Sequence, residues 1–508
     1  MTTKLKIKKL KVLLINPPKM LLPGEHGRLS IYPPLGLAYI AAAIENKHEV
    51  KILDAVLEDW KRVENGFHGM NFSDIAKFVE EKKPDVIGIT GLSFVAESIH
   101  KTINAIKKKS KARIVVGGPY ATNATFDLMK NKNVDFAIIG EGEETISDLL
   151  EAIKNKKSIK KVKGIVYRDR DKIKFTKQRE YIQNLDSINF PARHLLKMEE
   201  YFEIFKTGHG AEGIGRCVSM ITSRGCPFNC FFCTASKITG KKWRARSPEN
   251  IIKEIDNLVS SYNITDIYFE DENISLNPER MKKIMSLIIS RNYKLNLHAE
   301  QGMRADTLSL EILKMMKNAG FNDIVVAPES GAQRVLNEVV GKNLDLKKVE
   351  QVARDAKKVG ISVGCYFVIG MPGETKKEII ETIKFAKKLR RIGVRYCTFN
   401  NAVPLKGTRM YEIAKEKGYL LKEGEELDRA ILKNRHKHMM KTEDWTNEEV
   451  DKLYKKAVKQ NARHTLFSLD MIKHRIKRIG KNLFNSPILT IRTSFIRIKE
   501  IIFGERDY

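Results

Sequence analysis

Cysteine is scarce in this chain and unevenly distributed. Only six of the 508 residues are cysteine, and the first 216 residues contain none. So few thiols in so long a chain exclude the disulfide scaffold of small secreted proteins. Three of the six lie together at Cys226, Cys230 and Cys233. In a chain without a secretion signal, such a cluster indicates a metal site in a reducing compartment.

Long hydrophobic runs are missing as well. No stretch of about 18 apolar residues occurs, so we expect no membrane-spanning helix. Residues 1–11 alternate Lys with Leu and Ile, and they lack the apolar stretch and cleavage site of a signal peptide. We therefore expect a cytoplasmic protein.

Acidic residues are in deficit. The chain has 62 Asp and Glu against 92 Lys and Arg, which gives a formal net charge of +30. This excess of positive charge suggests that the protein binds a polyanion, an anionic membrane surface or an acidic substrate. The alternative is that the charge only reflects Lys-rich, solvated helix faces. Because the charge is spread from Lys4 to Lys499 and not concentrated in one patch, we expect no nucleic-acid partner.

Residues 1–152 alternate strand and helix patterns. Short apolar segments such as Val12–Ile15 and Val86–Thr90 end in turns rich in Gly, Pro and Asn, and helical patterns separate them. The alternation predicts an α/β domain with a doubly wound, Rossmann-like parallel sheet. Ligands of such sheets bind beyond the carboxyl ends of the strands, where these turns lie.

Residues 216–425 form a second alternating region. Six predicted strands with helices between them indicate a partial (β/α)6 barrel: 218–222, 266–270, 294–299, 323–327, 362–369 and 395–400. Functional residues of such folds lie at strand carboxyl ends. Residues 153–215 are a predicted linker, and 426–508 a helical C-terminal region in which Thr446 and Glu449 form a capping box.

The three clustered cysteines lie in one loop after the first strand of this second region. Iron–sulfur clusters are held by Cys thiolates, normally four for each [4Fe–4S] unit. Three ligands leave one iron open to chelate another molecule. A structural zinc ion normally takes four ligands, and the nearest further candidates are Cys217 and His209. We therefore favour an iron–sulfur cluster over zinc.

The loop Cys226-x-x-x-Cys230-x-Phe232-Cys233 resembles the signature of radical S-adenosylmethionine (SAM) enzymes. The resemblance implies a [4Fe–4S] cluster whose open iron binds SAM. It also implies reductive cleavage of SAM to a radical that takes hydrogen from an unreactive carbon, and an electron donor such as a flavodoxin or ferredoxin.

Further segments between about residues 217 and 420 carry the same resemblance. It implies that six residues contact SAM: Phe232, Asp271, Glu272, Glu329, Ile369 and Gly370. Phe232 and the fifth-strand segment would lie against the adenine, the acidic turn near the amino group, and Glu329 at the ribose hydroxyls. No residue is assigned a catalytic role.

The N-terminal motifs Asn16-Pro17-Pro18, Gly117-Gly118-Pro119 and Gly140-Glu141-Gly142-Glu143 resemble cobalamin-binding domains fused to radical SAM barrels. The resemblance implies six cobalamin contacts: Asn16, Gly91, Gly117, Gly118, Glu141 and Gly142. The alternative is that the glycines only close turns. No Asp-x-His-x-x-Gly string is present, so no histidine is placed to ligate cobalt from below.

The resemblance implies a cobalamin-dependent methyltransferase that acts on an unactivated carbon of a small-molecule or lipid substrate. The alternatives are cobalamin-assisted cyclisation, rearrangement or oxidation, and a non-catalytic cobalamin or redox sensor. Transfer RNA methylthiolation is disfavoured because residues 1–216 lack cysteine. The basic, amphipathic residues 471–503 suggest either a peripheral membrane contact or a helical lid on the barrel.

Overall fold

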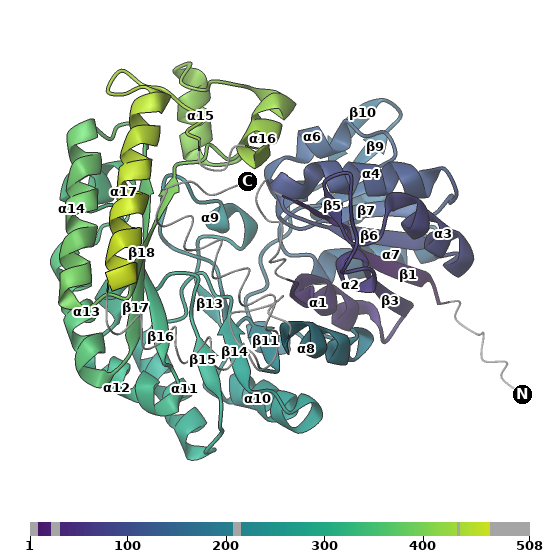
Figure 1. The fold of residues 1–508 in the computed structure, drawn as a ribbon. Coiled ribbons are helices and arrows are strands. Elements are labelled where there is room, and N and C mark those ends of the chain that lie inside the picture. The colour runs from purple at the N-terminus through teal and green to yellow at the C-terminus, as the bar shows by residue number, and fades with distance from the viewer. Residues whose placement is uncertain (1–8, 22–30, 207–214, 434–436, 468–508) are drawn as a thin grey trace, which may run out of the picture. The chain divides into compact units, whose positions relative to one another are not determined.

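A computed structural model describes residues 9–21, 31–206, 215–433 and 437–467, and these residues form two compact units (Figure 1). Unit 1 comprises the described residues up to 201 together with 234–244, and unit 2 comprises the remainder. Residues 471–503 lie outside the described residues.

Unit 1 is built on a seven-stranded sheet with the order β10-β9-β8-β7-β6-β1-β3. The strands are β1 (Lys11–Asn16), β3 (Glu49–Asp54), β6 (Val86–Thr90), β7 (Arg113–Gly117), β8 (Phe136–Ile138), β9 (Ile165–Asp169) and β10 (Lys172–Phe175). The first five are parallel, and β9 and β10 pair antiparallel. The chain order changes direction between β1 and β6, which is the ligand-binding switch point of doubly wound sheets.

Helices cover both faces of this sheet. One face carries α1 (Leu35–Ile44) and α7 (Glu143–Lys154), and the other carries α3 (Phe72–Lys82), α4 (Ala96–Lys107), α5 (Pro119–Asn123) and α6 (Thr125–Met129). Successive residues of β1 divide between the two cores: Leu13 and Ile15 pack on the second face, and Val12 and Leu14 on the first. Burial on both faces explains the continuous apolar runs of these strands, and it confirms the predicted doubly wound fold.

The hairpin β9–β10 moves the end of unit 1 past the predicted domain boundary at residue 152. β9 pairs with β8 through Phe136 and Tyr167, and Ile165 and Val166 are buried in the two cores of the sheet. Much of the predicted linker 153–215 is therefore part of unit 1, because the apolar face of β9 extends the sheet.

Unit 2 contains six parallel strands in two three-stranded sheets, β11-β14-β15 and β16-β17-β18. The strands are β11 (Cys217–Met220), β14 (Asp266–Phe269), β15 (Asn296–His298), β16 (Asp323–Glu329), β17 (Ser362–Ile369) and β18 (Tyr396–Asn401). Bridges from Leu297 to Phe321 and from Met303 to Val326 connect the two sheets. The six strands match the predicted partial barrel.

Helices alternate with these strands: α10 (Pro248–Tyr262), α11 (Pro278–Ser290), α12 (Leu310–Ala319), α13 (Leu346–Val359) and α14 (Lys376–Ile392). In β17, Cys365, Phe367 and Ile369 are buried, and the Phe367 ring packs against Phe385 of α14 at 6.3 Å between centroids. Tyr366, on the opposite face, is half-buried. Alternation along β17 thus separates a helix-facing side from a barrel-facing side.

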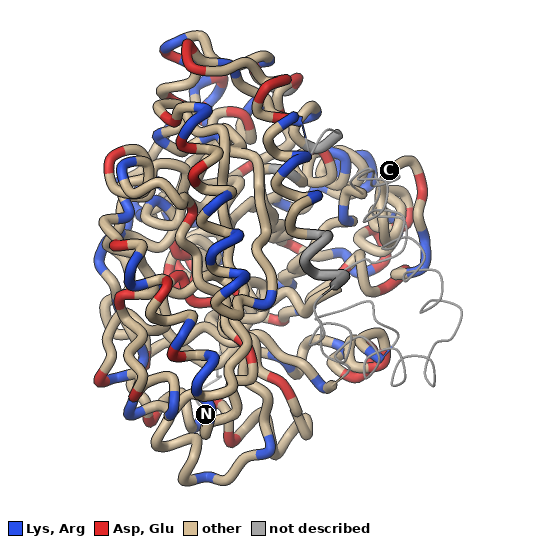
Figure 2. Tube along the Cα trace, turned by 60° about the vertical axis from the view of Figure 1, so that its left-hand side comes forward, with Lys and Arg blue, Asp and Glu red and all other residues tan. Residues whose placement is uncertain are grey.

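The C-terminal part of unit 2 comprises α15 (Arg409–Glu416), α16 (Gly424–Lys433) and α17 (Asn447–Phe467). The Thr446 hydroxyl accepts from Glu449 N at 3.3 Å, and Thr446 N donates to the Glu449 carboxylate at 2.9 Å. This confirms the predicted capping box. Within the part of the chain that the structure describes, no helix is long and apolar enough to cross a membrane. Figure 2 shows Lys and Arg dispersed along many elements among Asp and Glu.

The turn after β7 brings two strand ends close together. Gly118 has φ +85° and ψ −167°, and a Cβ at this residue would lie 2.6 Å from the Thr90 hydroxyl oxygen at the end of β6. Tyr120 N donates to Gly91 O at 3.0 Å. A glycine is therefore required at position 118 both by the backbone conformation and by the close approach.

Replacing Gly118 with alanine should destabilise unit 1 by about 1–3 kcal/mol, because side chains rarely adopt this backbone conformation. The midpoint of thermal unfolding, followed by circular dichroism, would show the loss. Gly36→Ala in α1 is the control, since no atom lies within 4 Å of the added Cβ. Equal unfolding midpoints for the two variants would contradict the requirement for glycine at position 118.

Candidate functional site

The cysteine loop follows β11 and the short strand β12 (Ser223–Arg224) in unit 2. Its three cysteines are free thiols; Cys226 and Cys230 are half-buried and Cys233 is exposed. Burial raises the pKa of Cys226, and it raises that of Cys230 to about 11. Metal binding deprotonates a thiol outright. Three thiols on one loop thus fit the donor set of a cluster with one open iron.

Backbone hydrogen bonds at Phe231 fix the second half of this loop to the rest of unit 2. Phe231 N donates to Val340 O, and Met410 N donates to Phe231 O, each at 3.0 Å. Cys233 N donates to Cys230 O at 3.0 Å. Phe232, the aromatic predicted beside the adenine, is half-buried between these anchored residues.

Asp271 holds the start of the loop. Its carboxylate accepts from Thr222 N at 3.0 Å, the Thr222 hydroxyl at 2.7 Å and the Ser223 hydroxyl at 2.5 Å. The side chain is buried, and burial raises its pKa. Asp271 therefore joins the end of β14 to the residues that lead into the cysteines. Its predicted SAM contact stays a prediction.

Glu272, the next residue, acts on the first of the three cysteines through its charge. It is partly exposed, and its negative charge adds to burial in raising the pKa of Cys226. Of the two predicted acidic residues, Glu272 is the one whose charge reaches the first cysteine, whereas the Asp271 carboxylate is occupied by its three hydrogen bonds.

Glu329 ends β16 in a left-handed conformation with φ +67°. Lys342 Nζ donates to its carboxylate at 2.9 Å and also to Ala327 O. The side chains of Glu329 and Lys342 are only 11% and 8% exposed, so the two charges neutralise each other out of water. Carboxylate oxygens have more acceptor sites than this one bond uses, which suits the predicted ribose contact.

Arg304 extends this ion pair toward the cysteines. Its guanidinium donates to Lys342 O at 2.8 Å and stacks on the Phe228 ring at 3.7 Å from the centroid. Lys342 also opposes the effect of burial on the pKa of Cys230. Sequence reasoning missed Arg304 and Lys342, because a basic residue in a basic chain gives no signal that it is buried.

Gly370 closes β17 with φ +78°, and Ile369 before it is fully buried. The Glu374 carboxylate accepts from Gly370 N at 2.8 Å and from Met371 N at 3.2 Å. Burial raises the pKa of Glu374 to about 8. The turn predicted to pack on adenine is therefore shaped by a buried carboxyl group four residues on.

The C-terminal part of unit 2 packs behind this turn. A Cβ at Gly370 would lie 2.7 Å from His438 Cε1, and Trp445 Nε1 donates to Glu374 O at 2.7 Å. His438 is 1% exposed and Trp445 2% exposed. Glycine is thus needed at position 370 for the backbone conformation and for room beside His438.

The predicted cobalamin residues of unit 1 lie at the carboxyl ends of parallel strands. Asn16 Nδ2 donates to Asp54 at 2.8 Å, and Asp54 accepts from the Tyr201 hydroxyl at 2.5 Å. A Cβ at Gly91 would lie 2.7 Å from Ile99, whereas one at Gly117 would come no closer than 4.0 Å to Ile138. Asn16 and Gly91 follow the two strands of the switch point, which fits a bound ligand there.

Glu141 and Gly142 have structural partners inside unit 1. Glu141 accepts from Ile182 N at 2.7 Å and from Arg244 Nη1 at 2.9 Å, and a Cβ at Gly142 would lie 2.8 Å from Ile40. Arg244 closes the segment 234–244, which follows the cysteine loop in sequence and belongs to unit 1. The predicted cobalamin contacts of Glu141 and Gly142 remain predictions.

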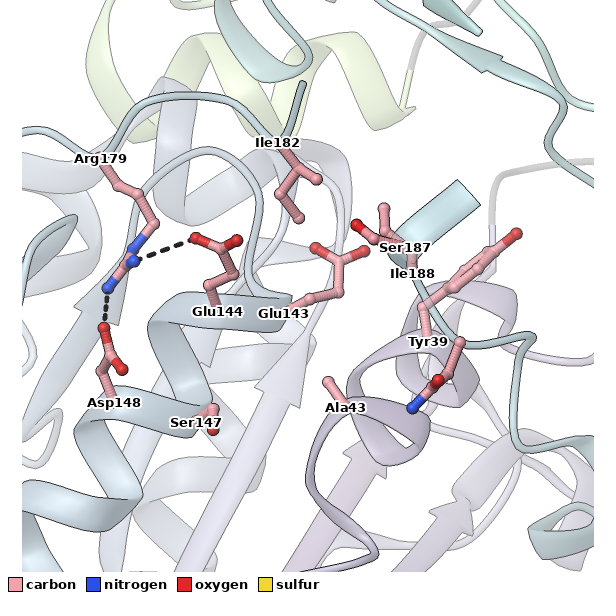
Figure 3. Close-up of a pocket in the computed structure, with 11 residues that line it drawn as sticks. Tyr39, Ala43, Glu143, Glu144, Ser147, Asp148, Arg179, Ile182, Ser187 and Ile188 are labelled. Carbon is pink, nitrogen blue, oxygen red and sulfur yellow. Dashed lines mark hydrogen bonds and ion pairs between the residues drawn. The ribbon is translucent and has the colours of Figure 1, made fainter. Parts of the chain in front are cut away.

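A cavity of about 320 Å³ lies beside the start of α7 in unit 1 (Figure 3). Glu143 and Glu144 line it together with Tyr39 of α1. Arg179 donates to Glu144 at 3.1 Å and to Asp148, so the cavity wall has more acidic than basic groups. Sequence reasoning did not predict this cavity, because its lining comes from three distant segments.

Replacing Asp271 with asparagine should lower the iron and sulfide content of the anaerobically reconstituted protein. The amide N–H₂ group cannot accept the hydrogen bonds of Thr222 and Ser223, and a buried unsatisfied partner costs about 1–3 kcal/mol. Glu279→Gln on α11 is the control, since its side chain is 81% exposed. Full iron content in Asp271→Asn would refute the anchoring role.

Replacing Glu141 with alanine should destabilise unit 1 by about 3–5 kcal/mol, since it leaves a buried guanidinium without its carboxylate. Thermal unfolding would measure the loss, and limited proteolysis should then cut within residues 234–244. Glu144→Ala removes a solvent-exposed partner of Arg179 and should cost about 1 kcal/mol or less. Similar losses in both variants would argue against the buried pair.

Comparison with known proteins agrees with both halves of this description. Residues 220–386 match the radical SAM superfamily, and residues 28–150 match the B12 binding domain. The uncharacterized methyltransferase PH0819 of Pyrococcus horikoshii is 33% identical over 89% of this chain and 92% of its own length. Cytidylyl-2-hydroxyethylphosphonate methyltransferase of Streptomyces wedmorensis is 30% identical over 81% and 82%.

A further relative and a solved structure are also similar to this chain. The anaerobic magnesium-protoporphyrin IX monomethyl ester cyclase of Cereibacter sphaeroides is 25% identical over 70% of this chain and 56% of its own. The solved structure of the cobalamin-dependent SAM radical enzyme OxsB, with aqua-cobalamin and SAM bound, shares the fold with a TM-score of 0.72. It is 16% identical and covers 98% of this chain and 72% of its own. The cofactors predicted here, a [4Fe–4S] cluster, SAM and cobalamin, are thus those of the matched families. The chain belongs to the radical SAM enzymes that carry a B12-binding domain, and it is a cobalamin-dependent enzyme of the methyltransferase type.

Proposed function

We propose that this enzyme methylates an unactivated carbon of a small-molecule substrate. The observation that carries the proposal is the intact three-cysteine loop, anchored by Asp271 and faced by the Glu329–Lys342 pair, in a chain that also has a cobalamin-type unit. Two relatives with at least 30% identity are named methyltransferases, and each is matched along more than four-fifths of its length.

The chain's own residues bind and orient the cofactors in this proposal. When bound, the cluster, SAM and cobalamin supply the radical and the methyl group. The thiolates of Cys226, Cys230 and Cys233 hold the cluster. Glu329, neutralised by Lys342, offers carboxylate oxygens to hydroxyl donors, and Glu374 fixes the backbone of the Gly370 turn.

The substrate we favour is small and polar. The Streptomyces relative is named for a nucleotide-linked phosphonate, and a net charge of +30 suits an anionic substrate. A lipid substrate or a peripheral membrane contact was suggested by residues 471–503, which lie outside the described residues. We also propose a flavodoxin or ferredoxin as the electron donor, and no nucleic-acid partner.

The competing function is cyclisation or another rearrangement without methyl transfer. The cyclase relative supports it, although this chain spans only 56% of that protein. A non-catalytic sensor does not have to position a reacting molecule beside the cysteine loop. The buried Glu329–Lys342 pair is placed for such positioning, and it therefore argues against a sensor.

Anaerobic turnover with SAM that carries a deuterated methyl group separates these functions. The reconstituted, cobalamin-loaded enzyme is reduced and incubated with a small-molecule extract of the source cells. We expect a product that gains the labelled methyl group, together with equal amounts of 5′-deoxyadenosine and S-adenosylhomocysteine. Cys230→Ala should abolish all three signals.

Cys397→Ala is the matched control, because Cys397 is buried against α14 away from the loop, where its thiol lies 3.7 Å from Ala386 O. This variant should retain turnover. Formation of 5′-deoxyadenosine without label in any product would favour rearrangement over methylation. If the reduced enzyme cleaved no SAM at all, the result would contradict both methylation and rearrangement and would favour the non-catalytic sensor.

A further inference from the structure

A second group of metal-ligating side chains lies in unit 2, around the neighbouring strands β15 and β16. It contains His298, which ends β15, Asp323, which begins β16, and Glu300, two residues after His298. One ligand atom from each lies within 4.8 Å of the other two. We propose that these three residues bind a divalent transition-metal ion of the zinc class, separate from the cysteine loop.

The His298 ring is held in the way that metal-ligating histidines are held. Its Nε2 lies 3.2 Å from Asp266 Oδ1, and the other oxygen of Asp266 accepts from the Thr265 hydroxyl at 2.5 Å. A histidine that ligates a metal through one ring nitrogen usually donates its other N–H to such a carboxylate. Asp266 would thus fix the tautomer that leaves Nδ1 free to bind the ion.

The distance on the other side of the ring suits two ligands of one ion. His298 Nδ1 lies 3.4 Å from Asp323 Oδ1. A charge-assisted hydrogen bond is shorter, at about 2.7–2.9 Å. In a tetrahedral site with bonds of about 2.0–2.1 Å, neighbouring ligand atoms lie about 3.4 Å apart. Asp323 is therefore placed as a second ligand, and Glu300, with a ligand atom within 4.8 Å of the other two, as the third.

Tyr268 provides an independent sign of a missing ligand. Its ring stacks on His298, with centroids 4.3 Å apart and planes 11° from parallel. Tyr268 is 7% exposed, and its hydroxyl has no hydrogen-bond partner among the residues described. A buried tyrosine hydroxyl usually finds a partner. Water or another donor on the open coordination position of the ion would provide one.

The alternative is a charged His298 that bridges Asp266 and Asp323 without any metal. Such an ion network would join β14, β15 and β16 and would need neither Glu300 nor a partner for Tyr268. The two arrangements differ in one respect that can be measured. Three protein ligands leave a fourth position open on zinc, whereas the bridged imidazolium binds no ion.

The test is zinc binding by the holoenzyme with its iron–sulfur cluster and cobalamin in place. Equilibrium dialysis against Zn²⁺ and elemental analysis should give one zinc per chain in addition to the iron and cobalt. X-ray absorption at the zinc edge should show only nitrogen and oxygen ligands at about 2.0–2.1 Å. A sulfur shell at about 2.3 Å would mean that zinc had entered the cysteine loop, and it would overturn the proposal.

Variants identify the ligands. Glu300→Gln should weaken zinc binding at least tenfold, and it leaves the contact between His298 Nε2 and Asp266 in place. An unchanged midpoint of thermal unfolding would show that the fold is kept. His298→Ala should abolish binding. Glu311→Gln on α12, whose side chain is 64% exposed, should bind as the unchanged enzyme does. No zinc in the unchanged enzyme, or equal binding in Glu300→Gln and Glu311→Gln, would refute the site.

Discussion

The hydrogen bonds of the Asp271 carboxylate are the constraint on which the cysteine loop depends. A loop with three free thiols has many conformations, and its first residues must be fixed before the thiols can meet one cluster. Asp271 fixes Thr222 and Ser223 through three hydrogen bonds. Thr222 O accepts from the Arg280 guanidinium at 2.8 Å and from Arg246 N at 2.9 Å. Both polar atoms of the Thr222 backbone are therefore held.

A second constraint joins the loop to the opposite sheet of the barrel. Phe228 lies under Arg304, which binds the backbone of Lys342, whose ammonium group holds Glu329. A buried ion pair of this kind contributes little net stability, because desolvation offsets the attraction. Its value is positional: Glu329 keeps an unfavourable left-handed backbone only because the surrounding structure determines it. The strain and the ion pair together indicate a residue that is placed for binding.

The sequence allowed the fold class and the centre of the site to be predicted, for local reasons. Apolar strands alternate with amphipathic helices, three thiols lie within one loop, and Thr446 and Glu449 are three residues apart, as a capping box requires. What could not be predicted depends on distant pairs. Thr222 and Asp271 are 49 residues apart, and nothing near Lys342 in the sequence indicates that it is buried beside Glu329. The hairpin β9–β10 lies within the predicted linker 153–215, and its pairing with β8, between Phe136 and Tyr167, is a contact between distant segments that local pattern does not indicate.

The donor types of the two sites explain how unit 2 could keep two metals apart. The cysteine loop offers soft thiolates, which select iron–sulfur clusters. The proposed second site offers imidazole and carboxylate, which suit zinc and similar ions. The two sites also use different segments, because the thiolates follow β11 and β12, whereas His298 ends β15 and Asp323 begins β16. An ion at the second site would also offset the carboxylates gathered there.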